Sequence, residues 1–400
     1  MFVLSGQAAQ SISTFLTGLL IARWGGQAEL GYYAVAYSFC FLTVCISDAL
    51  LATPYTYFYS SAPARRSSML MAAYCGVFGL SVVLGLSVPI LFLSGVQSLE
   101  SVVISLPFAL LAIAFREMFK RHLHVANKLT MAFCNDVLSS GLQVVLVFVL
   151  GVTGYLSAAT AYVAITVAIA FSIFLFFRHL SIEFRAGWGR ETRYWLRQYF
   201  QYGRWLILGT TCHVAGAQLY PWLVLAKAGA AGAGIFAACM ALANLLNPLL
   251  IGLTNYFRPR FMERYQVMAP KALSRYVGKV ALLFMGPALV FVSLVWLQGG
   301  ALLALFYGDG YRAGEASLFY LALGGLFIAL AAPLQLALLA ARIPVTNLLY
   351  HATSLLLIVL ASFLSWNFLS SNGLSHIYAG VNFAGLLMLV CFFWVRVANR

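Results

Sequence analysis

The chain has 400 residues, of which 63% are hydrophobic and only 8% are charged, and its mean hydropathy is +0.92. A water-soluble domain of this length carries far more charge on its surface, so the composition excludes a soluble enzyme or binding domain and indicates an integral membrane protein. The first 22 residues are apolar and lack a basic leader and a small-residue cleavage site. We therefore expect them to form a first spanning helix rather than a signal peptide.

A helix that crosses the membrane needs about 20 consecutive apolar residues. Segments of this kind recur along the whole chain, and the loops between them are too short to hold a soluble domain. The sequence therefore predicts an all-α integral membrane protein with twelve transmembrane helices. The expected spans are residues 2–22, 31–53, 69–93, 102–119, 131–150, 155–177, 202–225, 230–253, 277–298, 316–341, 345–365 and 374–397.

The cations are distributed very unevenly over the loops. If the N-terminus is cytoplasmic, all 24 Lys and Arg residues except Arg23, Lys227 and Arg312 fall at the cytoplasmic side. By the positive-inside rule we expect both termini in the cytoplasm and an even number of spans. The net charge of +14 is then explained by basic loops facing anionic lipid headgroups, and no nucleic-acid partner is implied.

A short pattern occurs twice, about two hundred residues apart. Arg23 is followed by Gly25, Gly26, Gly31 and an aromatic pair, and Lys227 is followed by a similar run with Gly229 and Gly234. We interpret this as one half-protein used twice, in a parallel repeat. The predicted divisions are an N-terminal six-helix lobe, an amphipathic cytoplasmic linker rich in Arg, Trp and Tyr, and a C-terminal six-helix lobe, over residues 1–177, 178–201 and 202–400.

Arg23 and Lys227 depart from the charge rule of the chain, because they lie at the outer ends of their helices. Two interpretations remain open. Each cation can extend to the outer headgroups, or the two can face a central cavity and attract an anion such as a diphosphate, with arginine forking onto two oxygens. The polar residues Asn244 and Asn247 are a further substrate-binding candidate, and they can instead bond a neighbouring helix.

Ionisable side chains inside spans tend to face a wet cavity or a charged partner. Asp48 and Asp136 are candidates for coupling transport to a proton or sodium gradient, or they can neutralise nearby cations. Arg116 and Glu117 are adjacent and point about 100° apart, so we expect them not to pair with each other. We expect Glu117 to pair with Arg121 four residues later.

His213 and His351 are expected to be packed core histidines. The seven cysteines all fall inside predicted helices, with no Cys-x-x-Cys and no Cys/His cluster. The sequence therefore predicts no metal site, disulfide framework or cofactor.

Three segments together resemble a known family. They are IARWGGQAELGYYAVA from residue 21, AKAGAAGAGIFAACMALA from residue 226, and ALLALFYGDGYRAGEASLFYLALGG from residue 301. The last contains an outer-loop pattern of polysaccharide flippases, here Tyr307 to Ala313. The chain resembles the O-antigen and exopolysaccharide flippases of the multidrug/oligosaccharidyl-lipid/polysaccharide (MOP) exporter superfamily, and Arg23 is similar in position to a first-helix cation of peptidoglycan-precursor flippases.

The resemblance implies a V-shaped, two-lobed transporter with a central cavity in the bacterial inner membrane. It would carry lipid-diphosphate-linked oligosaccharide outward by alternating access for surface polysaccharide or lipopolysaccharide synthesis, with polymerases or glycosyltransferases as possible partners. The first helix offers only Gln7 and Gln10 where drug exporters of this superfamily often have an acid. A small-molecule or drug exporter of the same fold remains the alternative. A membrane polymerase is disfavoured because the outer loops are short.

Overall fold

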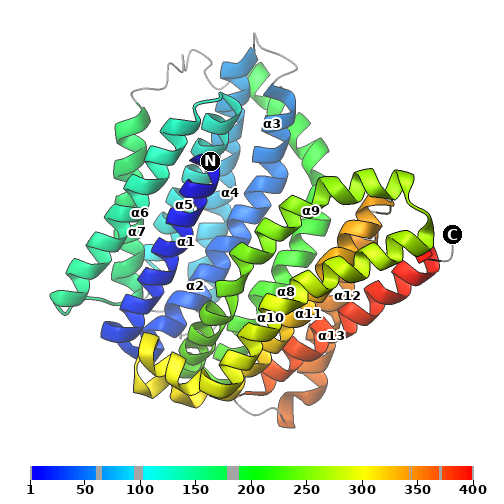
Figure 1. The fold of residues 1–400 in the computed structure, drawn as a ribbon. Coiled ribbons are helices and arrows are strands. Elements are labelled where there is room, and N and C mark those ends of the chain that lie inside the picture. The colour runs from blue at the N-terminus through cyan, green and yellow to red at the C-terminus, as the bar shows by residue number, and fades with distance from the viewer. Residues whose placement is uncertain are drawn as a thin grey trace. The chain divides into compact units, whose positions relative to one another are not determined.

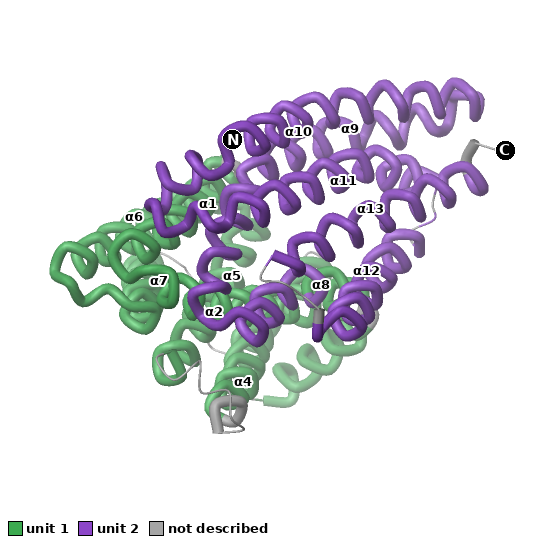
Figure 2. Tube along the Cα trace, turned by 90° about the horizontal axis from the view of Figure 1, so that it is seen from below, with its two compact units in different colours: residues 1–214 green, residues 215–400 purple. Residues whose placement is uncertain are grey.

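The structure is a computed structural model of the chain. It describes residues 2–59, 65–93, 102–177, 189–341, 343, 345–368 and 372–398. The described residues form helices joined by short turns, as the long apolar runs predict (Figure 1). The chain divides into two units, residues 1–214 and residues 215–400, and this division falls inside one long helix (Figure 2).

The first unit contains seven α-helices and the beginning of an eighth. Two of its helices pass into short π-helical turns, named η1 and η2. The elements are α1 (Phe2–Leu20), η1 (Ile21–Gly25), α2 (Gly26–Ser47), η2 (Asp48–Ala52), α3 (Thr53–Tyr59), α4 (Arg66–Leu93), α5 (Ser105–Val125), α6 (Leu129–Val152), α7 (Ala158–Phe177) and the start of α8 (Arg190–Ala243).

The second unit begins within α8 and is arranged around α11, which packs against α9, α10 and α13. Its buried core includes Phe261, Phe284 and Leu389. The elements are η5 (Asn244–Leu246), α9 (Asn247–Val267), α10 (Pro270–Tyr307), η6 (Asp309–Gly314), α11 (Glu315–Ala340), α12 (Val345–Ser365), η7 (Trp366–Phe368), α13 (Gly373–Phe393) and η8 (Trp394–Ala398).

Nine segments of the described ranges are long and apolar enough to cross a membrane. Two of them, Ser5–Tyr59 with 55 residues and Gly209–Val267 with 59, are more than twice the length of a single crossing of roughly 30 Å. Each contains a break at a glycine, so each has room for two spans. The charged helix α5 is not one of the nine. The all-helical membrane fold is thus confirmed, and the number of twelve crossings stays a prediction.

The repeated sequence pattern has a repeated backbone conformation. Gly26 has φ 86° and ψ −176°, and Gly229 has φ 69° and ψ −175°. Only glycine adopts this region readily, because a Cβ atom would clash with the neighbouring backbone. The two glycines therefore interrupt their helices in the same way. Gly26 lies three residues after Arg23, and Gly229 lies two residues after Lys227.

The aromatic residues that follow these glycines also have similar surroundings. The ring of Tyr33 stacks on Tyr162 near the start of α7, with centroids 5.3 Å apart, and the Tyr162 hydroxyl donates to the Tyr33 carbonyl over 2.8 Å. In the second unit Phe236 stacks on Tyr220, which in turn contacts Tyr378 near the start of α13. The aromatic pair of the repeat thus packs the helices of its own unit together.

The segment proposed as an amphipathic linker is described from residue 189 onward, and the rest of it lies outside the described residues. From Arg190 it is part of α8, which continues without a break into the expected seventh span. Trp195 and Tyr199 are buried in the core of the first unit, and the Tyr199 hydroxyl donates to the Met69 carbonyl over 3.0 Å. The buried side of this amphipathic helix therefore packs on protein, and its arginines are exposed.

The expected span 230–253 is interrupted. Helix α8 ends at Ala243, and a single 3₁₀ turn separates it from α9, which has Pro248 in its first turn. Proline lacks the N–H that would continue the ladder of α8. Helix α10 runs from Pro270 to Tyr307 and so begins before the expected span 277–298, and its backbone is non-helical at Gln298, where that span was expected to end.

Candidate functional site

The second half of α5 carries four charged residues, Arg116, Glu117, Lys120 and Arg121, after a mostly apolar first half. Residues four apart lie on one side of a helix, so this spacing directs Arg116 and Lys120 along one side and Glu117 and Arg121 along the next. Side chains from α1, η2 and α6 meet them there. We call the resulting set of residues the α5 network: Gln10, Asp48, Arg116, Glu117, Lys120, Arg121 and Asp136.

The centre of the α5 network is a buried ion pair. The Lys120 Nζ atom lies 3.0 Å from Asp136 Oδ2, and the side chains are 13% and 2% exposed. Gln10 bridges the pair, because its Oε1 accepts from Lys120 over 2.9 Å and its Nε2 donates to Asp136 over 3.4 Å. Gly6 allows this approach of α1 to α6, since a Cβ atom there would lie 2.7 Å from Asp136 Oδ2.

Arg116 and Glu117 do form an ion pair, with Nη2 and Oε1 3.1 Å apart. The expectation that these neighbours would not pair is therefore wrong, because their long side chains bend across the angle between their Cβ directions. Glu117 also accepts a 3.5 Å bond from Gln10 Nε2. The Nε atom of Arg116 is buried without a hydrogen-bond partner.

Asp48 opens the π-helical turn η2 and pairs with Arg121. Its other carboxylate oxygen accepts a 3.2 Å bond from Thr53. The expected pair of Glu117 with Arg121 is therefore wrong, because Arg121 turns to the carboxylate that η2 offers. Single π-helical turns occur often at functional sites. This pair is about 40% exposed on both sides, unlike the buried pair of Lys120 with Asp136.

Asp48 and Asp136, the two residues predicted to couple transport to an ion gradient, both pair with cations of α5. Asp48 pairs with Arg121, and Asp136 pairs with the adjacent Lys120. Each of the three carboxylates in the α5 network is paired with its own cation, so the network carries no net charge. The partner helices that produce this result could not be read from the sequence. Its visible signal was the density of charge on α5, and the contributions of Gln10 and Lys120 were missed.

The predicted substrate cations have different surroundings. Arg23 is exposed in the turn η1 of the first unit. Lys227 of the second unit donates from Nζ to the Trp366 carbonyl over 2.7 Å, and Nζ lies 5.4 Å from the centroid of the Trp366 ring. The ammonium group therefore ties α8 to the turn η7, and it retains N–H groups for a further acceptor.

Asn244 and Asn247 lie together and exposed at the junction of α8 and α9. The Asn247 Nδ2 atom donates to Asn244 Oδ1 over 3.0 Å. They are some distance from Lys227, since the helix that follows Gly229 rises about 22 Å before it reaches Asn244. The structure thus brings the two asparagines together, and it separates them from the cation of the same unit.

The outer-loop motif is a packing element of the second unit. Tyr307 and Tyr311 are buried with ring centroids 5.5 Å apart, and a Cβ atom at Gly314 would lie 2.7 Å from both Cys239 Sγ and Ile235 Cγ2. The motif therefore packs directly on the helix that follows Gly229. Arg312, the third cation predicted to lie on the outer side, forms an exposed ion pair with Asp309 at 3.0 Å.

Within the ranges that the structure describes, no three His, Cys, Asp or Glu side chains lie where they could share a metal ion. The α5 network consists of paired cations and carboxylates, so it offers exchange of ion-pair partners and of protons. An anion that approaches its cations has to displace a carboxylate, and a proton that neutralises Asp48 or Asp136 releases a cation.

The chain has the helical fold of solved MOP superfamily transporters. It matches an inward-facing MATE-family multidrug resistance transporter of that superfamily with a TM-score of 0.75 and 14% identity, over 100% of this chain and 98% of the other. It matches the lipid II flippase MurJ in an inward closed conformation with a TM-score of 0.77 and 13% identity, over 98% and 87% of the two chains.

A third similar structure is the MATE multidrug transporter DinF-BH in complex with R6G, with a TM-score of 0.65 and 12% identity over 100% and 95% of the two chains. No protein-family model matches the chain, and no curated protein matches its sequence. The likeness therefore establishes the fold, which drug exporters and a lipid flippase share, and the choice between these activities has to come from the residues of this chain.

Proposed function

We propose that the chain is a flippase that moves lipid-diphosphate-linked oligosaccharide across the bacterial inner membrane for surface polysaccharide synthesis. Two findings support a transporter over a membrane enzyme. The fold is shared over nearly the whole chain with MATE transporters and with MurJ, which is named a lipid II flippase. The acids of the α5 network are also all paired with cations.

The observation that favours an anionic cargo is the pairing of every acid in the α5 network. An exporter of cationic drugs needs a carboxylate that can accept the drug or exchange it for an ion. In the first unit Asp48, Glu117 and Asp136 each have a cation partner, and α1 contributes the neutral amide of Gln10. Glu29, in the first turn of α2, accepts the backbone N–H of Ala158. The second unit has Glu263, Asp309 and Glu315 only at helix ends and turns.

In this proposal Arg23 and Lys227 bind the diphosphate, and Asn244 and Asn247 bind sugar hydroxyls. Arginine presents a fork to two oxygens, and lysine presents a point charge with donors to spare. Asp48 is the coupling carboxylate that solvent reaches, because its ion pair with Arg121 is about 40% exposed. Asp136 would respond only when its buried pair opens. We also propose that both termini lie in the cytoplasm, which reporter fusions at either end would test.

Deletion of the gene in its host, followed by complementation, tests the cargo. We expect loss of surface polysaccharide on deletion, recovery with the unaltered chain, and no recovery with Arg23→Ala or Lys227→Met although both variants reach the membrane. Arg312→Ala is the matched control, because it removes the third outer cation, and it should restore the polysaccharide. Normal polysaccharide in the deletion strain together with increased drug susceptibility would favour the exporter instead.

A further inference from the structure

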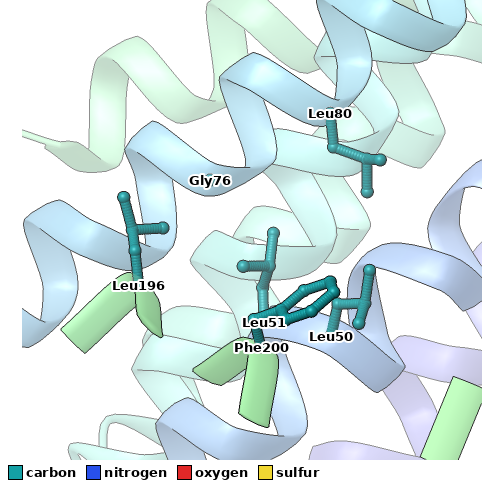
Figure 3. Close-up of a pocket in the computed structure, with 6 residues that line it drawn as sticks. All are labelled: Leu50, Leu51, Gly76, Leu80, Leu196 and Phe200. Atoms are coloured by element: carbon teal, nitrogen blue, oxygen red, sulfur yellow. The ribbon is translucent and has the colours of Figure 1, made fainter. Parts of the chain in front are cut away.

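The first unit contains an apolar cavity of about 150 Å³ beside the α5 network (Figure 3). Three elements form it: the π-helical turn η2, helix α4 and the beginning of α8. Its lining has no polar side chain, so it suits an apolar ligand. The lining residues are Leu50, Leu51, Gly76, Leu80, Leu196 and Phe200.

Two backbones cross closely beside the cavity. A Cβ atom at Gly203 of α8 would lie 2.7 Å from the Ala49 carbonyl oxygen and from Leu50 Cα, so only glycine allows α8 to lie this near η2. Phe200 is 62% exposed, and Leu80 is half-buried, so the cavity reaches the surface of the first unit. Figure 3 shows Leu80 pointing from α4 toward Leu50 and Phe200.

The same part of α8 carries a row of exposed arginines. With 3.6 residues per turn, Arg193, Arg197 and Arg204 project within about 40° of one another, and Phe200 lies about 20° to one side of this row. All three arginines are exposed, and Leu196 lies at the border between the row and the buried side of the helix. A stripe of positive charge therefore adjoins the apolar cavity.

We propose that the cavity and the arginine row together bind an anionic phospholipid of the inner leaflet. The phosphate of the headgroup contacts Arg193 and Arg197, and the adjoining part of one acyl chain enters the cavity past Phe200. Charge complementarity and the apolar lining favour this occupant over a soluble anion, which could not use the cavity. Basic pockets between helices on the cytoplasmic side are known to bind anionic headgroups.

In this location the lipid would stabilise the packing of α8 against η2. Leu50 and Leu51 belong to the turn that Asp48 opens, and Leu196 and Phe200 belong to the helix that leads from the first unit toward the second. A chain in the cavity fills the space between these elements and favours their docked arrangement. This role is independent of the cargo, so it holds for a flippase and for a drug exporter alike.

Native mass spectrometry of the full chain in detergent tests the proposal, with titrations of dioleoyl phosphatidylglycerol and dioleoyl phosphatidylcholine. We expect tighter binding of phosphatidylglycerol. The double variant Arg193→Gln/Arg197→Gln should weaken it by roughly 25-fold, at about a factor of five for each charge. Leu80→Trp, which fills the cavity, should weaken it roughly tenfold or more with every arginine in place. Leu80→Ala, which enlarges the cavity, should retain binding.

The matched control is Arg258→Gln/Arg275→Gln, which removes two exposed cations of the second unit and should leave the tightest site unchanged. Equal weakening in this control would overturn the proposal, because it would mean unspecific attraction to a basic protein. Unchanged binding by Leu80→Trp would also overturn it, because no chain would then enter the cavity. Displacement of phosphatidylglycerol by a lower concentration of undecaprenyl diphosphate would assign the site to cargo lipid instead.

Discussion

Substitution of Lys120 by methionine should destabilise the first unit strongly. The change removes the cation 3.0 Å from Asp136, whose carboxylate is only 2% exposed. An uncompensated charge then remains in a site with little water, and the loss of one partner of a buried pair costs about 3–5 kcal/mol. Asp136→Leu alone should cost a similar amount, because it leaves the ammonium group of Lys120 buried with only the carbonyl of Gln10.

The double variant Lys120→Met/Asp136→Leu should be far less unstable than the sum of its parts. Two apolar side chains of similar volume replace the pair without an orphaned charge. Gln10 then loses two of its bonds, for a remaining cost of about 1–3 kcal/mol. The coupling energy of the cycle is therefore expected to be several kcal/mol, measured by equilibrium unfolding in sodium dodecyl sulfate with near-ultraviolet circular dichroism.

Arg121→Met provides the matched control for this cycle. Its partner Asp48 is about 40% exposed, and exposed pairs contribute only about 0–1 kcal/mol. Additive effects of the Lys120 and Asp136 substitutions, or an equal loss of stability in Arg121→Met, would refute the view that the buried pair organises this region.

Two further predictions concern the turns and the helix ends. Gly26→Ala and Gly229→Ala should each destabilise the protein by about 1–3 kcal/mol in thermal melts, because both glycines have backbone conformations that other residues rarely adopt. Gly325→Ala is the control: no atom lies within 4 Å of the added Cβ, so it should be neutral or slightly stabilising in the same melts. Glu29→Ala should cost about 1.5–3 kcal/mol, since the carboxylate accepts a 2.6 Å bond from the Ala158 N–H at the start of α7; Glu29→Gln should lose less, and equal losses would contradict a role of the charge.

The helices could be predicted because their signal is local. Long apolar runs leave few alternatives inside a membrane, where the backbone has to satisfy its own hydrogen bonds. The turn at the repeated glycine was also predictable from a local pattern, because each glycine follows a cation at the end of an apolar run. Gly26 and Gly229 adopt the same backbone conformation. The ends of the helices were less accessible, as shown by α5, which continues past the expected limit at residue 119 to Val125 and so includes Lys120.

The partners of the charged residues could not be predicted, because they lie on different helices. The bond from Lys120 to Gln10 spans 110 positions of sequence, and the bond from Arg121 to Asp48 spans 73. Spacing along a single helix suggested Glu117 as the partner of Arg121, and the competing carboxylate of η2 was invisible to that argument. Pairing across helices depends on which faces meet, and uniformly apolar spans contain little information about their rotation.

Translocation by the purified chain in proteoliposomes tests the proposed function most directly. The vesicles would contain an undecaprenyl-diphosphate-linked oligosaccharide in both leaflets, and a membrane-impermeant glycosidase would digest only the outer pool. We predict that the unaltered chain makes nearly all of the lipid-linked sugar accessible, that Arg312→Ala does so equally, and that Arg23→Ala leaves about half protected. The flippase proposal would be contradicted if about half of the sugar stayed inaccessible to the glycosidase with the unaltered chain present, while the same vesicles actively extruded rhodamine 6G.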